Sequence, residues 1–223
     1  MKLSVIIPVY NEESTIAEIV SRVKAVPIKK EIVVVDDGSA DKTPKILDGI
    51  DGIIVIHKEN GGKGSAIREG LRIVTGEVTV IQDADLEYDP NDFVVMLDVM
   101  KKEGVDVVYG SRILHKDYRI SYRRYFWGGK LVTMVANMLY GISITDEPTC
   151  YKMIKTELLR SLNLTCTRFE FCPEVTAKVA RRRIRIVEVP ISYFPRTMEE
   201  GKKINAFDGL EAVWTLIKYR VKK

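Results

Sequence analysis

Three acidic side chains follow one another closely after a short apolar run. Asp83, Asp85 and Glu87 come after residues 78–81, which are typical of a strand buried on both faces of a parallel sheet. In extended chain, Asp83 and Asp85 project to the same side, and carboxylates held this close repel one another unless a cation lies between them. A divalent cation with oxygen ligands and phosphate partners is the natural occupant. An acidic turn is the competing interpretation, but the carboxyl end of a buried strand is where open α/β sheets bind ligands, which favours the metal site.

Polar clusters also end the other apolar runs in the first half of the chain. Five such runs are predicted as strands, at residues 3–9, 31–35, 53–57, 78–81 and 106–109. Asp36 and Asp37 follow the second run, and Arg112 follows the fifth. Lys63, between glycines after the third run, can reach a phosphate as the lysine of a phosphate-cradling loop does, although a solvated loop is the alternative. Asp36 has the simpler alternative role of holding its own turn.

Helical patterns alternate with these runs. The first predicted helix has Asn11 as its N-cap, the second opens at Thr43, the third carries Ile67, and the fourth covers residues 91–102. Strand and helix in alternation predict an α/β fold with a doubly wound, mostly parallel sheet. The carboxyl ends of its strands meet at one edge, so we expect the polar clusters to converge on one cleft.

The second half has a different character. Four helical patterns are predicted, at residues 121–140, at 156–162, from 173 onward and at 207–223. One strand is predicted at 184–189, a polar loop at 146–151 and a basic loop at 193–205. In the first of these helices the apolar residues include Trp127, Leu131, Met134 and Met138. No linker separates the halves, so residues 1–223 are predicted to form a single domain.

Composition and charge exclude several classes of protein. With 46% hydrophobic and 30% charged residues among 223, the chain is that of a globular rather than a disordered protein. Residues 1–111 hold 13 basic and 20 acidic side chains, a net charge of −7, whereas residues 112–223 hold 22 and 11, a net charge of +11. The basic half should therefore meet an anion. No nucleic-acid motif is present, because three arginines at 181–183 do not amount to one.

The expected compartment is the cytoplasm. The three cysteines have no metal-ligand spacing and are odd in number, which indicates reduced thiols rather than disulfides or zinc. Residues 1–10 run into a strand rather than a signal peptide, and no apolar run approaches the length of a membrane span.

Five motifs in a fixed order resemble a known family. They are Pro8-Val9-Tyr10-Asn11-Glu12, Asp36-Asp37-Gly38-Ser39-x-Asp41-x-Thr43, Asn60-x-Gly62-Lys63-Gly64, Asp83-x-Asp85 and Gly110-Ser111-Arg112. The chain resembles the inverting GT-A glycosyltransferases of family 2, and within them the dolichol-phosphate mannose synthase and polyprenyl-phosphate glycosyltransferase branch. The resemblance implies the GT-A fold, with residues 1–111 binding a nucleoside diphosphate sugar and residues 112–223 binding the acceptor.

The resemblance also assigns the donor site and the metal. GDP- or UDP-sugar would be bound by Pro8, Tyr10, Glu12, Val35, Asp37, Lys63, Asp83 and Ala84. Mg²⁺ or Mn²⁺ would be bound by Asp83, Asp85 and Glu87, where Glu87 replaces the family's usual glutamine and adds negative charge. The resemblance further implies catalytic roles for Asp83, Asp85, Arg112 and Arg196.

A polyprenyl phosphate is the acceptor that the resemblance implies. Its phosphate would be bound by Arg112, Arg124 (or its neighbour Arg123), Arg196 and Lys203, although the loop that carries Lys203 has one more residue than the family's and no serine. The alternative is a family 2 enzyme acting on a saccharide hydroxyl. A hydroxyl needs a general base, for which Glu174 is the candidate; its competing role is a first-turn charge in a helix.

The last predicted helix indicates contact with a membrane surface. Residues 207–223 are amphipathic and end in a basic tail, which predicts peripheral attachment to anionic lipid on the cytoplasmic membrane face. The alternatives are a helix packed on the domain itself, or recruitment by a separate membrane-anchoring partner.

Overall fold

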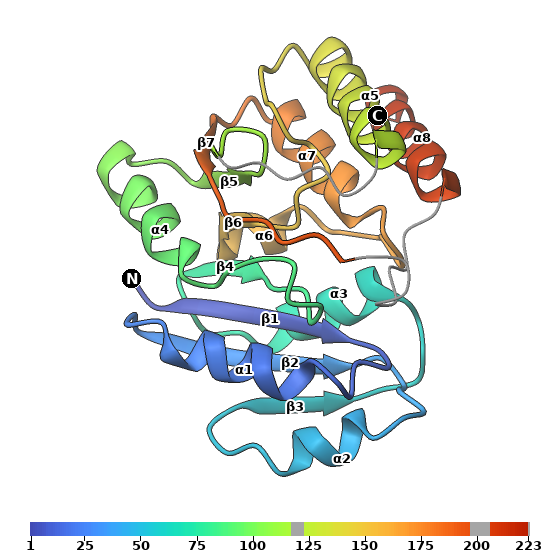
Figure 1. The fold of residues 1–223 in the computed structure, drawn as a ribbon. Helices are drawn as coiled ribbons and strands as arrows, with labels where there is room; N and C mark the ends of the chain where they lie inside the picture. Colours follow the sequence, from blue (N-terminus) through green and yellow to red (C-terminus); the bar gives the residue numbers. More distant parts are fainter. Residues whose placement is uncertain (117–122, 197–205, 223) are drawn as a thin grey trace.

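A seven-stranded sheet contains strands from both halves of the chain (Figure 1). The computed structural model describes residues 1–116, 123–196 and 206–222, with the side chains of 123–125 and 206 left aside. The strands are β1 (Leu3–Val9), β2 (Lys30–Asp36), β3 (Ile54–His57), β4 (Val78–Ile81), β5 (Val107–Ser111), β6 (Lys152–Lys155) and β7 (Ile186–Pro190). Their order is β3-β2-β1-β4-β6-β5-β7; β6 is antiparallel to both of its neighbours, β4 and β5, and all other neighbouring strands are parallel to each other. The predicted α/β fold is confirmed.

Helices cover both faces of this sheet. They are α1 (Ile16–Ala25), α2 (Thr43–Asp48), α3 (Lys63–Ile73), α4 (Asp92–Glu103), α5 (Arg123–Tyr140), α6 (Thr156–Ser161), α7 (Phe171–Arg181) and α8 (Ala206–Val221). Alternate residues of β1 explain the layers: Val5 and Ile7 pack with α1 and α4, while Ile6 packs with α3 and α7. A third, smaller cluster joins α5, α7 and α8 at one end of the molecule.

Strand β6 was not predicted; it lies between the predicted polar loop at 146–151 and the predicted helix at 156–162. It runs antiparallel between β4 and β5. The strand is difficult to predict from the sequence because it contains Lys152, and a lysine rarely occupies a buried strand position. Here its ammonium donates to the carbonyls of Glu147 (2.6 Å) and Thr149 (3.0 Å), and it lies 4.1 Å from the ring centroid of Tyr109. These contacts replace the water that the buried cation loses.

The prediction that Asn11 caps the first helix is wrong. Helix α1 begins at Ile16, and Asn11 adopts a left-handed backbone conformation with φ of 50°. Its side-chain oxygen accepts the N–H of Ala40 at 2.8 Å, and its own N–H donates to Ser39 Oγ at 2.9 Å. Asn11 therefore ties the turn after β1 to the turn after β2, at the edge of the sheet where the polar clusters were expected.

Candidate active site

Lys63 and Asp83 form a half-buried ion pair at the carboxyl edge of the sheet. Lys63 is the first residue of α3, and its Nζ lies 2.5 Å from Asp83 Oδ1 and 3.1 Å from Cys150 Sγ. Burial alone would lower the pKa of Lys63, but the Asp83 carboxylate outweighs it and holds that pKa well above its usual value. The lysine is therefore a fixed positive charge beside the acidic strand end.

Asp85 lies in a site that is short of positive charge. Burial and the neighbouring carboxylates of Asp83 and Glu87 together raise its pKa to about 7, although the Glu87 N–H and Arg196 offset part of this rise. One of its oxygens accepts the Glu87 N–H at 3.0 Å. Hard oxygen ligands with a surplus of negative charge fit a divalent cation.

Glu87 serves a different segment of the chain. Its carboxylate accepts the Tyr193 hydroxyl at 2.9 Å and the Arg196 N–H at 2.7 Å, while its carbonyl accepts the Phe194 N–H at 2.8 Å. Glu87 thus anchors residues 193–196 to the acidic strand end. Within the described ranges, no group of three or more His, Cys, Asp or Glu side chains is arranged to hold a metal ion. The predicted role of Glu87 as a third metal ligand therefore stays a prediction.

Arg196 joins the turn after β1 to the acidic strand end. Its guanidinium pairs with Glu12 at 3.0 Å, and its Nε donates to the Asp85 carbonyl. Both side chains of the ion pair are largely buried, at 13% and 11% exposure, so the pair is only weakly screened by water. Arg196 therefore lies between the predicted nucleotide-binding turn and the predicted metal site.

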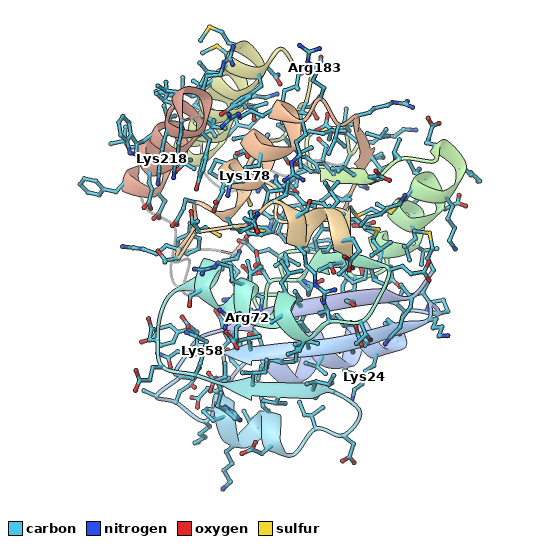
Figure 2. The ribbon with its side chains drawn as sticks, turned by 180° about the vertical axis from the view of Figure 1, so that it is seen from behind. Lys24, Lys58, Arg72, Lys178, Arg183 and Lys218 are labelled. Carbon is cyan, nitrogen blue, oxygen red and sulfur yellow. The ribbon has the colours of Figure 1, made fainter. Side chains whose placement is uncertain are left out.

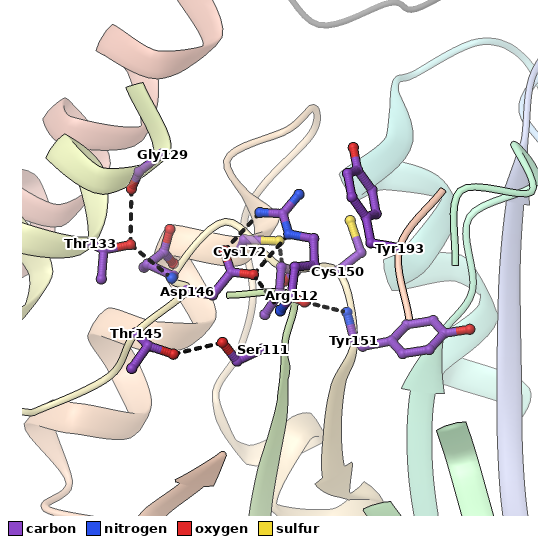
Figure 3. A network of polar contacts seen from close by, with 12 residues as sticks. Ser111, Arg112, Gly129, Thr133, Thr145, Asp146, Cys150, Tyr151, Cys172 and Tyr193 are labelled. Atoms are coloured by element: carbon purple, nitrogen blue, oxygen red, sulfur yellow. Dashed lines mark hydrogen bonds and ion pairs between the residues drawn. The ribbon is translucent and has the colours of Figure 1, made fainter. Parts of the chain in front are cut away.

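Arg112 is held by a carboxylate that the sequence did not single out. Its guanidinium makes a two-pronged contact with Asp146, at 2.8 and 2.7 Å, and its backbone N–H donates to the same carboxylate at 3.0 Å (Figure 3). Burial alone would raise the pKa of Asp146, but Arg112 outweighs it and holds the pKa below its usual value. Glu188 in turn accepts the Asp146 N–H at 3.2 Å, which fixes the segment.

Tyr193 connects the two arginines. The guanidinium of Arg112 lies 5.0 Å from the Tyr193 ring centroid, and the Tyr193 hydroxyl donates to Glu87, which also accepts the Arg196 N–H. Tyr193 and Glu87 therefore link the side chain of Arg112 to the backbone of Arg196, although the two arginines come from separate segments. The Arg124 side chain and the whole of Lys203 lie outside the described residues, so their predicted roles remain predictions.

The predicted nucleotide residues line the neighbouring strand ends. Pro8 and Val35 are register partners in β1 and β2, Ala84 is buried, and Tyr10 is 41% exposed. Asp37 accepts the N–H groups of Gly61 and Gly62, at 3.0 and 2.7 Å, and pairs with Lys58 at 2.6 Å.

The glycine-rich loop is packed tightly as well as tied to Asp37. A Cβ at Gly62, whose φ is 89°, would meet the Thr167 carbonyl at 2.4 Å. Asp37 thus orders the loop that opens α3. Its partner Lys58 was not predicted, because an isolated lysine carries no motif.

Glu174 occupies a fully buried position between α7, α8 and residues 165–166. Its carboxylate accepts hydrogen bonds from Thr165, Cys166, Lys178 and Tyr219. Burial alone would raise its pKa, but these bonds lower it to about 2. A carboxylate so stabilised is a poor general base, because efficient proton transfer needs a pKa near the working pH.

The remaining predictions concern cysteines and membrane spans. All three cysteines are unpaired, and Cys166 and Cys172 are buried, as predicted. Among the helices of the described residues, none is long and apolar enough to cross a membrane.

The chain is similar to several curated glycosyltransferases. The chain is 29% identical to a dolichol-phosphate mannosyltransferase of Pyrococcus furiosus, covering 98% of this chain and 64% of that protein. It is 28% identical to an undecaprenyl-phosphate 4-deoxy-4-formamido-L-arabinose transferase of Pseudomonas aeruginosa, covering 90% and 60%. It is 29% identical to the low-salt glycan biosynthesis hexosyltransferase Agl6 of Haloferax volcanii, covering 88% and 49%. The chain thus spans between half and two thirds of the length of these curated relatives.

The fold and the family follow from two further comparisons. Glucosyl-3-phosphoglycerate synthase from Mycobacterium tuberculosis, solved with Mn²⁺, UDP and phosphoglyceric acid, superposes with a TM-score of 0.71 over 99% of this chain and 78% of its own, at 20% identity. That similarity concerns the fold, and the predicted GT-A fold is confirmed. Residues 4–162 match the model described as glycosyl transferase family 2, which is most of the chain. The chain therefore belongs to glycosyl transferase family 2.

Proposed function

We propose that this chain transfers a sugar from a GDP- or UDP-sugar to a polyprenyl phosphate, with Mg²⁺ or Mn²⁺ as cofactor. The observation that carries the proposal is that Tyr193 and Glu87 link the Arg112 side chain to the segment of Arg196, whose own side chain contacts the acidic strand end. A donor diphosphate and an acceptor phosphate are both anions, so a site for both needs cations on each side of the reacting carbon. The names of two curated relatives also specify dolichol phosphate or undecaprenyl phosphate.

The donor side uses the turns after β1, β2 and β4. Asp37 fixes the loop before α3 and leaves Lys63 at the amino end of that helix, where the positive charge of its ammonium favours phosphate. Lys63 is neutralised by Asp83, so a bound diphosphate would compete with Asp83 for the lysine. We propose that this exchange frees Asp83 for the cation.

Asp83 and Asp85 are the proposed ligands of the divalent cation. When bound, the cation would supply positive charge against the negative charge that develops on the departing diphosphate. Burial and the carboxylates of Asp83 and Glu87 raise the pKa of Asp85 to about 7. This surplus of negative charge around Asp85 supports the assignment. Arg196 adds a second positive charge at the same strand end through its contact with the Asp85 carbonyl.

The acceptor side needs no general base. A phosphate monoester has a second pKa near 6, so it is already an anion at neutral pH. Arg112 and Arg196 are proposed to bind it, each oriented beforehand by one carboxylate, Asp146 and Glu12. The hydroxyl-acceptor alternative relied on Glu174, and the buried contacts of that residue argue against it.

A lipid acceptor implies work at a membrane surface. The three unpaired thiols fit a reducing compartment, so we propose the cytoplasmic face of the membrane, with a separate anchoring partner as the alternative means of recruitment.

A donor panel tests the proposal. Purified chain would be incubated with GDP- and UDP-sugars, a short polyprenyl phosphate and Mg²⁺ or Mn²⁺, and lipid-linked product would be followed by mass spectrometry. We expect product with at least one donor and none in excess chelator. Equal product formation with and without chelator would contradict the metal assignment, and no product from any donor would contradict the proposed reaction.

A further inference from the structure

Helix α5 carries a row of large apolar side chains that the protein leaves uncovered. Trp127, Leu131, Met134 and Met138 recur every three or four residues and are between 51% and 73% exposed. The opposite face of the same helix is buried through Val132 and Ala136. The row therefore continues along one side of the helix and faces away from the protein.

Helix α8 carries a second exposed row. Phe207, Leu210, Trp214, Ile217 and Val221 are 39% to 79% exposed, whereas Leu216 and Tyr219 on the other side are buried. Packing on the domain, one of the two alternatives predicted for this helix, accounts for its inner face only. Its inner face packs and its outer face stays open.

The two rows belong to one surface. Helices α5 and α8 lie side by side at the end of the molecule farthest from β3 (Figure 1), and the Tyr140 hydroxyl of α5 donates to the Leu216 carbonyl of α8 at 2.6 Å. Both helices pack their inner residues on α7, so both outer rows face away from it. Soluble monomers rarely expose a continuous apolar surface of this kind without a binding role.

Cations border this surface. Lys218 and Arg220 flank the apolar row of α8 on opposite sides by helical spacing, and both are exposed; Figure 2 shows Lys218 on the outside of the helix. Lys130 lies beside the row of α5, whose sequence contains no acidic residue. Asp208 and Glu211, the acidic residues of α8, are confined to its first two turns. Trp127 and Trp214 are exposed within these apolar faces, and tryptophans bordered by lysine or arginine are typical of a bilayer interface.

The same helix α5 also holds the acceptor arginine in place. On its inner side, Thr133 Oγ accepts the Glu147 N–H at 3.0 Å (Figure 3), and Asn137 exchanges two hydrogen bonds with the backbone of Ile144. The residues between these two contacts include Asp146, the partner of Arg112. A partner bound to the outer side of α5 would therefore be separated from the proposed phosphate site by the thickness of this helix.

We infer that the outer faces of α5 and α8 together form a docking surface for an anionic lipid bilayer. The choice of lipid as the occupant rests on the proposed function, because a polyprenyl phosphate presents its phosphate at the bilayer surface. The bordering cations bind the headgroups, and the apolar rows enter the boundary between headgroups and acyl chains.

Vesicle sedimentation of the full chain tests this inference. We expect binding to vesicles of anionic and neutral lipid mixed, little binding to purely neutral vesicles, and loss of binding at high salt. The double variant Trp127→Gln/Trp214→Gln should weaken binding at least about tenfold, since each side chain withdraws a large apolar area. The matched control is Val94→Gln/Val95→Gln, which changes two exposed apolar residues of α4 and should bind as the parent does.

A charge-reversal pair supplies the second arm. Lys218→Glu/Arg220→Glu should weaken binding by about tenfold or more, because each cation near an anionic surface contributes about a fivefold factor. Lys45→Glu/Lys101→Glu makes the same change in net charge on α2 and α4 and should have little effect. Unchanged thermal melts would show that all variants fold, since every altered side chain is exposed.

Three outcomes would overturn the inference. They are equal binding by the parent and the tryptophan variant, equal binding to neutral and anionic vesicles, and a stable dimer in light scattering that the tryptophan variant dissociates. The last outcome would assign the surface to a second copy. Transfer to a short, water-dispersed polyprenyl phosphate is measured separately, without vesicles. Its failure would contradict the proposed function while leaving the vesicle result intact.

Discussion

Arg196 and Glu12 form an ion pair of 3.0 Å although 184 positions separate them along the chain. Arg196 also donates to the carbonyl of Asp85, so one side chain holds the end of β1 and the acidic end of β4 together. In the proposed function, this cation would contact both the donor diphosphate and the acceptor phosphate. The contact makes residues 193–196 part of the site rather than a surface loop.

Arg196→Lys tests the acceptor role of this arginine. We expect the acceptor KM to rise about tenfold to a hundredfold, because lysine cannot make a two-pronged contact with phosphate. Steady-state kinetics at saturating donor measure it. Arg185→Lys alters an exposed pair with Glu103 and should change the acceptor KM by no more than about twofold. An acceptor KM that stays at the parent value in Arg196→Lys would remove this residue from the acceptor site.

Glu87→Gln separates an anchoring role from a metal-binding role. The Glu87 carboxylate accepts two hydrogen bonds, from the Tyr193 hydroxyl and the Arg196 N–H, through its two oxygens. Glutamine has only one side-chain oxygen, so the attachment of residues 193–196 to this position should weaken. For an anchor, we expect the acceptor KM to rise severalfold while the apparent affinity for Mn²⁺ stays within about twofold. Titration of activity with Mn²⁺ distinguishes the two roles. A large loss of Mn²⁺ affinity with an unchanged acceptor KM would make Glu87 a metal ligand.

Glu174→Gln should lower stability and leave turnover nearly intact. The folded protein lowers the pKa of Glu174 from 4.5 to about 2, so ionised Glu174 contributes stability above pH 4.5 that is lost as the pH falls towards 2. We expect the variant's free energy of unfolding to be lower at pH 7 by on the order of 2 kcal/mol, with the difference shrinking below pH 4.5. Urea unfolding at several pH values measures this. A difference that grows as the pH falls would contradict the assignment.

Much of the fold follows from the sequence because burial leaves a clear pattern. Apolar β-branched runs such as residues 78–81 predict strands, and the strand ends predict where the site lies. Strand β6 was not predicted, because the burial of Lys152 depends on its contacts with backbone carbonyls, and no local sequence pattern reveals such contacts. The partner of Arg112 was not predicted for a related reason. Asp146 lies 34 positions away along the chain and contacts Arg112 only in the folded protein.

The apolar row of α5 shows a second limit of sequence reading. Trp127, Leu131, Met134 and Met138 have the spacing of a buried helix face, yet Val132 and Ala136 on the opposite side are the buried residues. Periodicity reveals that a helix has an apolar face but not what covers it.

Asp85→Asn tests the metal site. The amide cannot supply the negative charge that binds a divalent cation, so we expect turnover to fall by about two orders of magnitude or more while the thermal melt shows a folded protein. Asp89→Asn, at an acidic residue after the same strand, is the matched control and should retain most activity. A comparable loss of turnover in both variants would mean that activity depends on the overall negative charge of this segment rather than on the Asp85 carboxylate.

The most direct measurement compares two acceptors that differ only in phosphate. Parent chain would be given the active nucleotide sugar with a short polyprenyl phosphate or with the corresponding polyprenol, and glycosylated lipid would be quantified. The proposed function predicts product from the phosphate and none from the alcohol, in the parent and in Glu174→Gln alike, because an ionised phosphate needs no base. Product from the alcohol that disappears in Glu174→Gln would contradict it and identify a hydroxyl-dependent transferase.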